Sequence, residues 1–171
     1  MNKVRQLQLS GNKKLRGVPR RLRALEKWAK NFEGHYYPRS ELGEKFSHWK
    51  IPVLSSLVNP PQTTTEIQTQ CMNAMLQAAN FLAQSVTEDQ QHYYRVACLF
   101  TLPWMFSSEV TIFYDPDYYR GFFGSQHQLA PRKLSAEFGL ILPAGFVERG
   151  CIVRDEEEGF SEEWWCIGQP L

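Results

Sequence analysis

The chain has 171 residues, of which 43% are hydrophobic and 22% are charged. These values are ordinary for a globular protein and exclude a disordered or low-complexity chain, and the length suits one domain built around one core. No run approaches the roughly 18 consecutive apolar residues of a membrane helix, and no apolar segment follows the first basic residues to form a secretion signal. We therefore expect a cytoplasmic protein that does not bind a membrane.

The formal net charge of +1 conceals an uneven distribution along the chain. Residues 1–50 contain 13 Lys or Arg against 4 Asp or Glu, whereas residues 51–171 contain 6 against 14. Either the two regions neutralise each other in the fold, or they present separate basic and acidic faces to partners.

The N-terminal region begins with a basic segment, residues 1–17, that has too few apolar residues to commit it to a packed element. We expect this segment to be a loose arm ahead of a single domain over residues 18–171. Pro19 suits the first turn of a helix, and Gly34 supplies a stop. Between them, apolar residues recur at helical spacing and predict an amphipathic helix: Leu22, Leu25, Trp28 and Phe32.

An aromatic loop is expected over residues 35–52, where no apolar period is sustained. The following helix is the clearest element of the chain. Thr63 and Glu66 have the spacing of a capping box, and the helix should reach about Val86. Its apolar residues lie on one helical face: Ile67, Cys71, Ala74, Met75, Ala78 and Leu82.

Two strands follow, over residues 93–102 and 109–114, because both segments are rich in β-branched and aromatic residues. Successive residues in them are apolar, so we expect central strands covered by helices on at least one face.

Two short helices are predicted after these strands. Residues 116–123 suit a helical turn with Asp115 as its N-cap and Gly124 as its stop. Residues 134–138 suit a second short helix.

The last segment predicts a β-hairpin, with strands over residues 146–154 and 160–167 and an acidic turn between them. Trp164 and Trp165 are adjacent, so a strand would direct their side chains to opposite faces. Together these elements predict an α+β fold: a single domain with a largely antiparallel sheet of about four strands, packed by two main amphipathic helices, and with a C-terminal β-hairpin.

The four cysteines are Cys71, Cys98, Cys151 and Cys166, and none belongs to a C-x-x-C pair. We interpret them as small core hydrophobes, because cysteine is among the most often buried residue types. A Cys151–Cys166 bridge across the hairpin is the alternative. No zinc, other metal or cofactor is expected.

Catalytic signatures are missing from the sequence: it contains no phosphate-binding loop, nucleophile elbow or zinc-binding helix motif. Asp115 and Asp117 follow a predicted strand, where carboxylates can hold a metal or act as general bases. Ordinary N-cap and turn chemistry explains the same residues. An enzyme whose site unites them with Glu109 or His127 is therefore one of three hypotheses.

Nucleic-acid binding through the basic arm and first helix is the second hypothesis. Basic side chains there could neutralise phosphates, although a solvated helix face explains them equally. The candidate residues are Lys13, Lys14, Arg16, Arg20, Arg21, Arg23 and Lys27.

The leading hypothesis is a non-enzymatic interaction protein whose contacts lie in the C-terminal hairpin. Tryptophan is enriched in binding hot spots, and acidic patches select basic partners. The acidic turn could instead only keep the hairpin from pairing with other chains. The candidate residues are Glu156, Glu157, Glu158, Glu162, Glu163, Trp164 and Trp165.

Several segments of the sequence form a recognisable set: Leu15 to Leu22, Trp28-Ala29, Trp49 to Val53, Thr63 to Glu66, Tyr114 to Tyr119, Phe122-Phe123 and Trp164 to Gly168. Together they resemble an uncharacterised bacterial family, the domain of unknown function thirty-nine sixteen, over about residues 13–168. The resemblance implies a bacterial source and a compact domain, and it carries over no catalytic residue. Small bacterial proteins of this kind are often neutralising partners of toxins. One form of the leading hypothesis is therefore an immunity protein that covers the active site of a cytosolic toxin.

Overall fold

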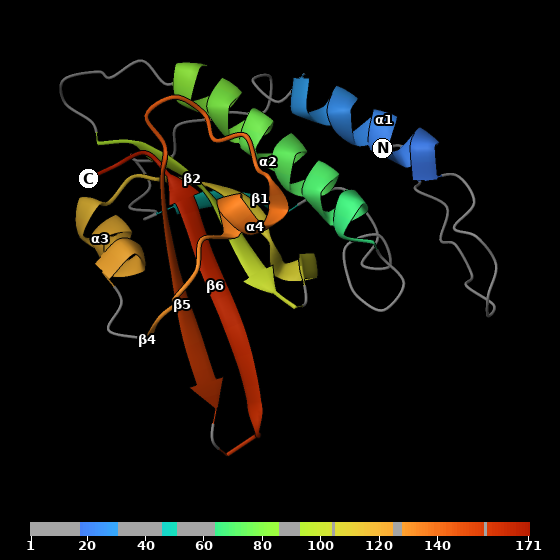
Figure 1. The fold of residues 1–171 in the computed structure, drawn as a ribbon. Coiled ribbons are helices and arrows are strands. Elements are labelled where there is room, and N and C mark those ends of the chain that lie inside the picture. The colour runs from blue at the N-terminus through green and yellow to red at the C-terminus, as the bar shows by residue number, and fades with distance from the viewer. Residues whose placement is uncertain are drawn as a thin grey trace.

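Four helices of α type, one short 3-10 helix and a six-stranded antiparallel sheet make up the described part of the chain (Figure 1). The structure is a computed structural model, and it describes residues 18–30, 46–50, 64–85, 93–103, 105–124, 128–155 and 157–171. The elements in chain order are α1 (Val18–Lys30), β1 (Phe46–Lys50), α2 (Thr65–Ser85), β2 (Arg95–Leu102), η4 (Met105–Ser107), β3 (Glu109–Phe113), α3 (Pro116–Gly124), β4 (Gln128–Leu129), α4 (Leu134–Phe138), β5 (Val147–Asp155) and β6 (Phe160–Gly168).

The sheet has the order β1-β3-β2-β6-β5-β4, and every neighbouring pair is antiparallel. The four strands expected from the sequence occupy its centre, and two short strands, β1 and β4, extend its edges. The predicted α+β fold, with an antiparallel sheet, two main helices and a C-terminal hairpin, is confirmed.

Strand β1 corrects one expectation, because residues 46–50 were expected to belong to an aromatic loop. They pair with β3 instead, from Phe46 opposite Phe113 to Lys50 opposite Glu109. Whether a five-residue edge strand forms depends on the neighbouring strand with which it pairs. The strand is too short to show a sustained apolar period in the sequence, so its own residues did not predict it. The rest of the expected loop and the basic arm lie outside the described residues.

Helix α2 begins one residue later than the capping-box spacing predicts. The hydroxyl of Thr64 accepts a hydrogen bond from the backbone N–H of Ile67 at 3.3 Å, so Thr64 is the N-cap. The expected apolar face is confirmed, and Met72, Leu76 and Ala79 are buried as well. Helix α1 packs along α2 and contributes the buried residues Leu25 and Ala29 to the same core, which explains the wider apolar surface of α2.

Both faces of the central sheet are covered. Helices α1, α2 and α4 lie on one side and the shorter α3 lies on the other (Figure 1). Strand β2 alternates its side chains between the two cores, Phe100 toward α2 and Leu99 toward α3. This double burial explains why β2 is apolar on successive residues, as the sequence indicated.

The two adjacent tryptophans of β6 separate as the strand geometry predicts. Trp165 is 2% exposed and belongs to the core shared with α2, whereas Trp164 is 41% exposed on the opposite face. The position of Trp165 in the sheet is made possible by Gly150 of β5, which stands directly opposite it. The β5–β6 hairpin continues beyond the helices and ends in a projecting tip (Figure 1).

No described helix is long and apolar enough to cross a membrane.

Candidate functional site

A cleft of about 430 Å³ opens between α3 and the sheet. We call it the α3 cleft. Apolar groups of the strands form most of its floor, and one side of α3 forms a wall. Its lining side chains and glycines include Leu99, Asp117, Tyr118, Gly121, Arg149, Cys151, Val153, Trp164 and Cys166.

Strand alternation explains why these residues meet. Arg149, Cys151 and Val153 occupy every second position of β5, so their side chains share one face of the sheet. Across the ladder, Cys166 stands opposite Arg149, and Trp164 stands opposite Cys151. The cleft floor is therefore set by the register of the hairpin.

Helix α3 is short enough to leave this floor partly open. Its start is fixed by Asp115, whose carboxylate accepts hydrogen bonds from the backbone N–H groups of Asp117 and Tyr118 at 2.8 and 3.1 Å. The predicted N-cap is thus confirmed. The helix spans nine residues and ends at Gly124. Gly121 borders the cleft, and a Cβ added there would meet no heavy atom within 4 Å.

Arg149 is the half-buried cation of the α3 cleft, and it makes no hydrogen bond or ion pair with any of the residues that the structure describes. The other polar groups nearby have partners. Asp117 pairs with Arg120 at 3.2 Å, and the indole N–H of Trp164 donates to Glu162 at 2.8 Å. The cleft therefore combines an apolar floor with one guanidinium that is available to an anion.

Three of the four cysteines are buried as the sequence indicated, whereas Cys151 is not, and two of the four, Cys151 and Cys166, line the cleft. All four are thiols, so the Cys151–Cys166 bridge does not form. Cys71, Cys98 and Cys166 are buried, and Cys151 is half-buried. Burial raises the pKa of the Cys71 thiol to about 12 and also raises the pKa values of Cys98 and Cys166. These three thiols stay protonated at neutral pH and are poor nucleophiles.

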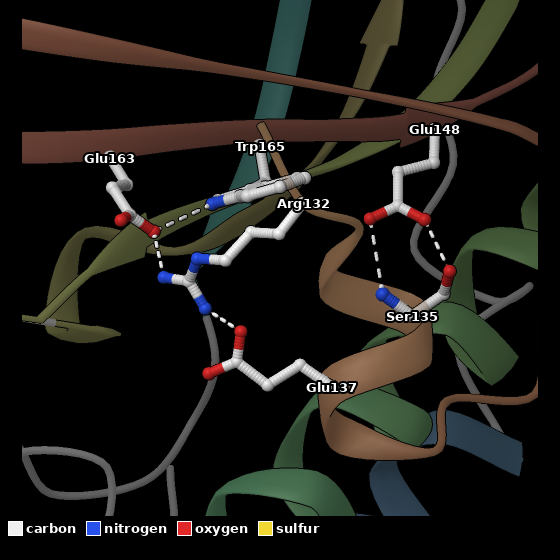
Figure 2. A network of polar contacts seen from close by, with 6 residues as sticks. All are labelled: Arg132, Ser135, Glu137, Glu148, Glu163 and Trp165. Carbon is white, nitrogen blue, oxygen red and sulfur yellow. Dashed lines mark hydrogen bonds and ion pairs between the residues drawn. The ribbon is translucent and has the colours of Figure 1, made fainter. Parts of the chain in front are cut away.

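A network of charged groups lies on the opposite face of the hairpin (Figure 2). The guanidinium of Arg132 pairs with Glu137 of α4 and with Glu163 of β6, the latter at 2.5 Å. Glu163 also accepts a hydrogen bond from the indole N–H of Trp165 at 3.2 Å. These contacts join the segment before α4 to the hairpin and satisfy the polar edge of a buried ring.

Glu148 of β5 makes the second connection of this network to α4 (Figure 2). One carboxylate oxygen accepts from the backbone N–H of Ser135 at 3.0 Å, and the other accepts from the Ser135 hydroxyl. Lys133, the N-cap residue of α4, makes no capping hydrogen bond, so Glu148 satisfies an early N–H of the helix instead. We interpret this network as structural.

The acidic and aromatic residues predicted to bind a partner do not form one surface. Glu157 and Glu158 are exposed in the turn, and Glu156 lies outside the described residues. Glu162 and Trp164 share the face of the α3 cleft, whereas Glu163 and Trp165 share the opposite face. Because Trp165 is buried, the exposed aromatic surface in this set belongs to Trp164.

The predicted basic patch is described only in part. Arg20, Arg23 and Lys27 are exposed on α1, while Lys13, Lys14 and Arg16 lie outside the described residues. For Arg21 the structure describes the backbone alone.

The acidic residues of the enzyme hypothesis have other contacts. Asp115 caps α3, Asp117 pairs with Arg120 at the surface, and Glu109 accepts from the Thr111 hydroxyl at 3.3 Å. His127 lies outside the described residues. In the described part of the chain, no group of three or more His, Cys, Asp or Glu residues could hold a metal ion.

Sequence reasoning did not identify Arg149, Cys151 and Val153 as site residues. The available signal was their position at every second residue of a predicted strand, which places their side chains on one face. That face can be identified as the floor of a cleft only when the positions of the partner strand and of α3 are known.

The fold and the cleft define the chain as a small α+β protein with an apolar pocket and one cation available to a ligand. Residues 26–169 match the model of the family described as "Protein of unknown function (DUF3916)", so the chain belongs to this family, and the resemblance noted in the sequence is confirmed. No curated protein and no solved structure matches it.

Proposed function

We propose that the chain is a non-enzymatic interaction protein that binds a partner protein through its β5–β6 hairpin. The observation that carries this proposal is the projecting hairpin (Figure 1), which has an acidic tip and an exposed tryptophan on its flank. Glu157 and Glu158 are exposed at the tip, and Trp164 is exposed on the face of the α3 cleft.

The chemistry of this surface favours a partner with a basic rim around an apolar pocket. A tryptophan buried at the centre of an interface is among the side chains that contribute most to affinity. Exposed carboxylates around it speed association with a positively charged partner and select against acidic ones. A bacterial toxin with a basic active site is one partner of this kind, and covering that site would neutralise it.

Charge reversal at the tip tests the proposal. The purified protein would be used to capture partners from the native cell extract, with nuclease treatment, and compared with a Glu157→Lys/Glu158→Lys variant and with Trp164→Ala. We expect the wild-type protein to capture one partner that neither of these two variants captures. A Glu26→Lys/Glu66→Lys variant reverses two exposed acidic residues on the helices instead and should retain the partner. Equal capture by all variants would contradict the proposal.

Nucleic-acid binding is the second candidate, favoured by the exposed Arg20 and Arg23 of α1 and by a first turn that contains no acidic residue. Affinity for a labelled oligonucleotide, measured by fluorescence anisotropy, should then fall by orders of magnitude between about 50 and about 200 mM salt. It should also be lost in the Arg20→Glu/Arg23→Glu variant. An affinity that does not change with salt concentration, or that is retained in the Arg20→Glu/Arg23→Glu variant, would exclude this candidate.

A further inference from the structure

We propose that the α3 cleft is a binding site for a small aromatic or aliphatic monocarboxylate, held with its apolar body on the sheet and its carboxylate on Arg149. This site is separate from the acidic tip of the hairpin, it shares only Trp164 with the interface proposed above, and it does not depend on that protein interaction.

The size and walls of the cleft suit such a ligand. Its volume of about 430 Å³ falls within the range of small-molecule pockets, roughly 300 to 1,000 Å³. Leu99 and Val153 provide an apolar floor, and the rings of Tyr118 and Trp164 border it. An apolar ligand body placed there would be removed from water on several sides, which is the main source of affinity for a small ligand.

The charge of the cleft specifies the polar end of the ligand. Arg149 is half-buried beside this apolar floor and has no partner within the described residues, so its guanidinium can donate two parallel hydrogen bonds to a carboxylate. A charge-assisted bond at a site partly shielded from water is stronger than the same bond at the surface.

Asp117 disfavours a second negative charge on the ligand. This residue also lines the cleft, and its carboxylate pairs with Arg120 at the surface. A second anionic group on the ligand would approach this carboxylate and be repelled. The combination of one available cation, one nearby anion and an apolar floor therefore favours an apolar acid over a dicarboxylate.

The first test compares 2-naphthoate with its neutral isostere 2-naphthamide by isothermal titration calorimetry. Both compounds offer the same apolar body, so the difference between them reports the carboxylate. We expect naphthoate to bind at least roughly tenfold more tightly than naphthamide, because a hydrogen bond between charged groups is worth more than a neutral one. Equal affinities, or no binding of naphthoate at millimolar concentration, would overturn the assignment.

Two variants and their controls locate the binding. Arg149→Gln should lower the affinity for naphthoate to about that for naphthamide, whereas Arg154→Gln, exposed on the same strand at a position facing the other side, should have no effect. Gly121→Leu extends a side chain into the open space beside the cleft and should weaken the binding of both compounds. Ala136→Leu, on the exposed surface of α4, should leave the binding of both unchanged. Naphthoate binding that survives both Arg149→Gln and Gly121→Leu would place the ligand elsewhere.

Alkylation of Cys151 gives a readout that needs no variant. This thiol lines the cleft and is half-buried, so bound naphthoate should slow its reaction with iodoacetamide, followed by mass spectrometry, and naphthamide at the same concentration should slow it less. An unchanged rate at saturating naphthoate would overturn the proposal even if Arg149→Gln fails to fold.

Discussion

Gly150 and Trp165 are direct partners across the β5–β6 ladder, and the indole ring occupies the space that a side chain on Gly150 would need. A Cβ at this position would lie 2.4 Å from two carbons of the ring. The glycine is thus required by a close approach, since it allows the largest fully buried side chain to lie against the strand.

Gly150→Ala should therefore destabilise the protein by about 1 to 3 kcal/mol, because the buried ring has to move. The free energy of unfolding, measured by urea denaturation, checks this. The matched control is Gly121→Ala, where the new Cβ enters open space in a helix and should be neutral or stabilising by up to about 1 kcal/mol. If both substitutions gave the same stability, Gly150 would not be needed for the packing of Trp165.

Two tyrosines near the α3 side of the sheet should respond in opposite ways to loss of the hydroxyl. Tyr119 donates a hydrogen bond to the backbone carbonyl of Gln169, so Tyr119→Phe should cost about 1 kcal/mol. The hydroxyl of Tyr93 is buried without a hydrogen-bond partner in the described part of the structure. Tyr93→Phe removes that uncompensated burial and keeps the ring under Arg95, 4.5 Å from its centroid, so stability should stay equal or rise. Thermal unfolding of the two variants distinguishes them, and a larger loss for Tyr93→Phe would contradict this assignment.

Stability should fall as the pH rises above about 9, the pKa of an unfolded cysteine. Burial raises the pKa values of Cys71, Cys98 and Cys166 in the folded state, so the folded protein retains protons that the unfolded chain releases. Each such thiol then lowers the free energy of unfolding by up to about 1.4 kcal/mol per pH unit.

Urea denaturation at about pH 7, 8, 9 and 10 measures this slope. Cys71→Ala should reduce the slope by the contribution of one thiol, whatever its effect on stability at neutral pH. A slope that is flat through this window would show that the buried thiols lose their protons as readily as those of the unfolded chain.

Thiol accessibility should separate one cysteine from the others. Cys151 is half-buried at the α3 cleft, whereas Cys71, Cys98 and Cys166 are buried. Alkylation of the native protein followed by peptide mass spectrometry should modify Cys151 first, and the other three should react only at the rate of unfolding. Rapid modification of Cys166 would show that the floor of the cleft opens more than the structure indicates.

The sequence predicted those elements whose signals are local. The apolar period of α2, the Asp115 cap of α3 and the acidic turn of the hairpin each lie within a few residues of the element that they define. Strand β1 was missed because its formation depends on the edge of β3, which lies about sixty residues further along the chain. The start of α2 was misplaced by one residue because consecutive threonines offer equivalent caps.

The α3 cleft could not be predicted in the same way. It requires the register that places Trp164 opposite Cys151 and the packing of α3 over that ladder, and neither follows from residue spacing alone. From the sequence, we applied the alternation of side chains along a strand to the two tryptophans. We did not apply the same alternation to the binding surface, and grouped Glu162, Glu163 and both tryptophans as one candidate set. Side chains adjacent in the sequence were therefore grouped, although the strand directs them to two surfaces.

The position of β6 between β2 and β5 has a consequence for assembly of the protein. Among the described strands, only this last one pairs with both the β1-β3-β2 half of the sheet and the β5-β4 half. Its pairing with β2 joins residues far apart in the sequence, such as Ala97 and Gly168. Such long-range pairing is slow to form. Until β6 pairs with β2, the apolar edge of β2 is unpaired and can pair with other chains. Aggregation during synthesis therefore competes with the insertion of β6, which can occur only after the hairpin has been synthesised.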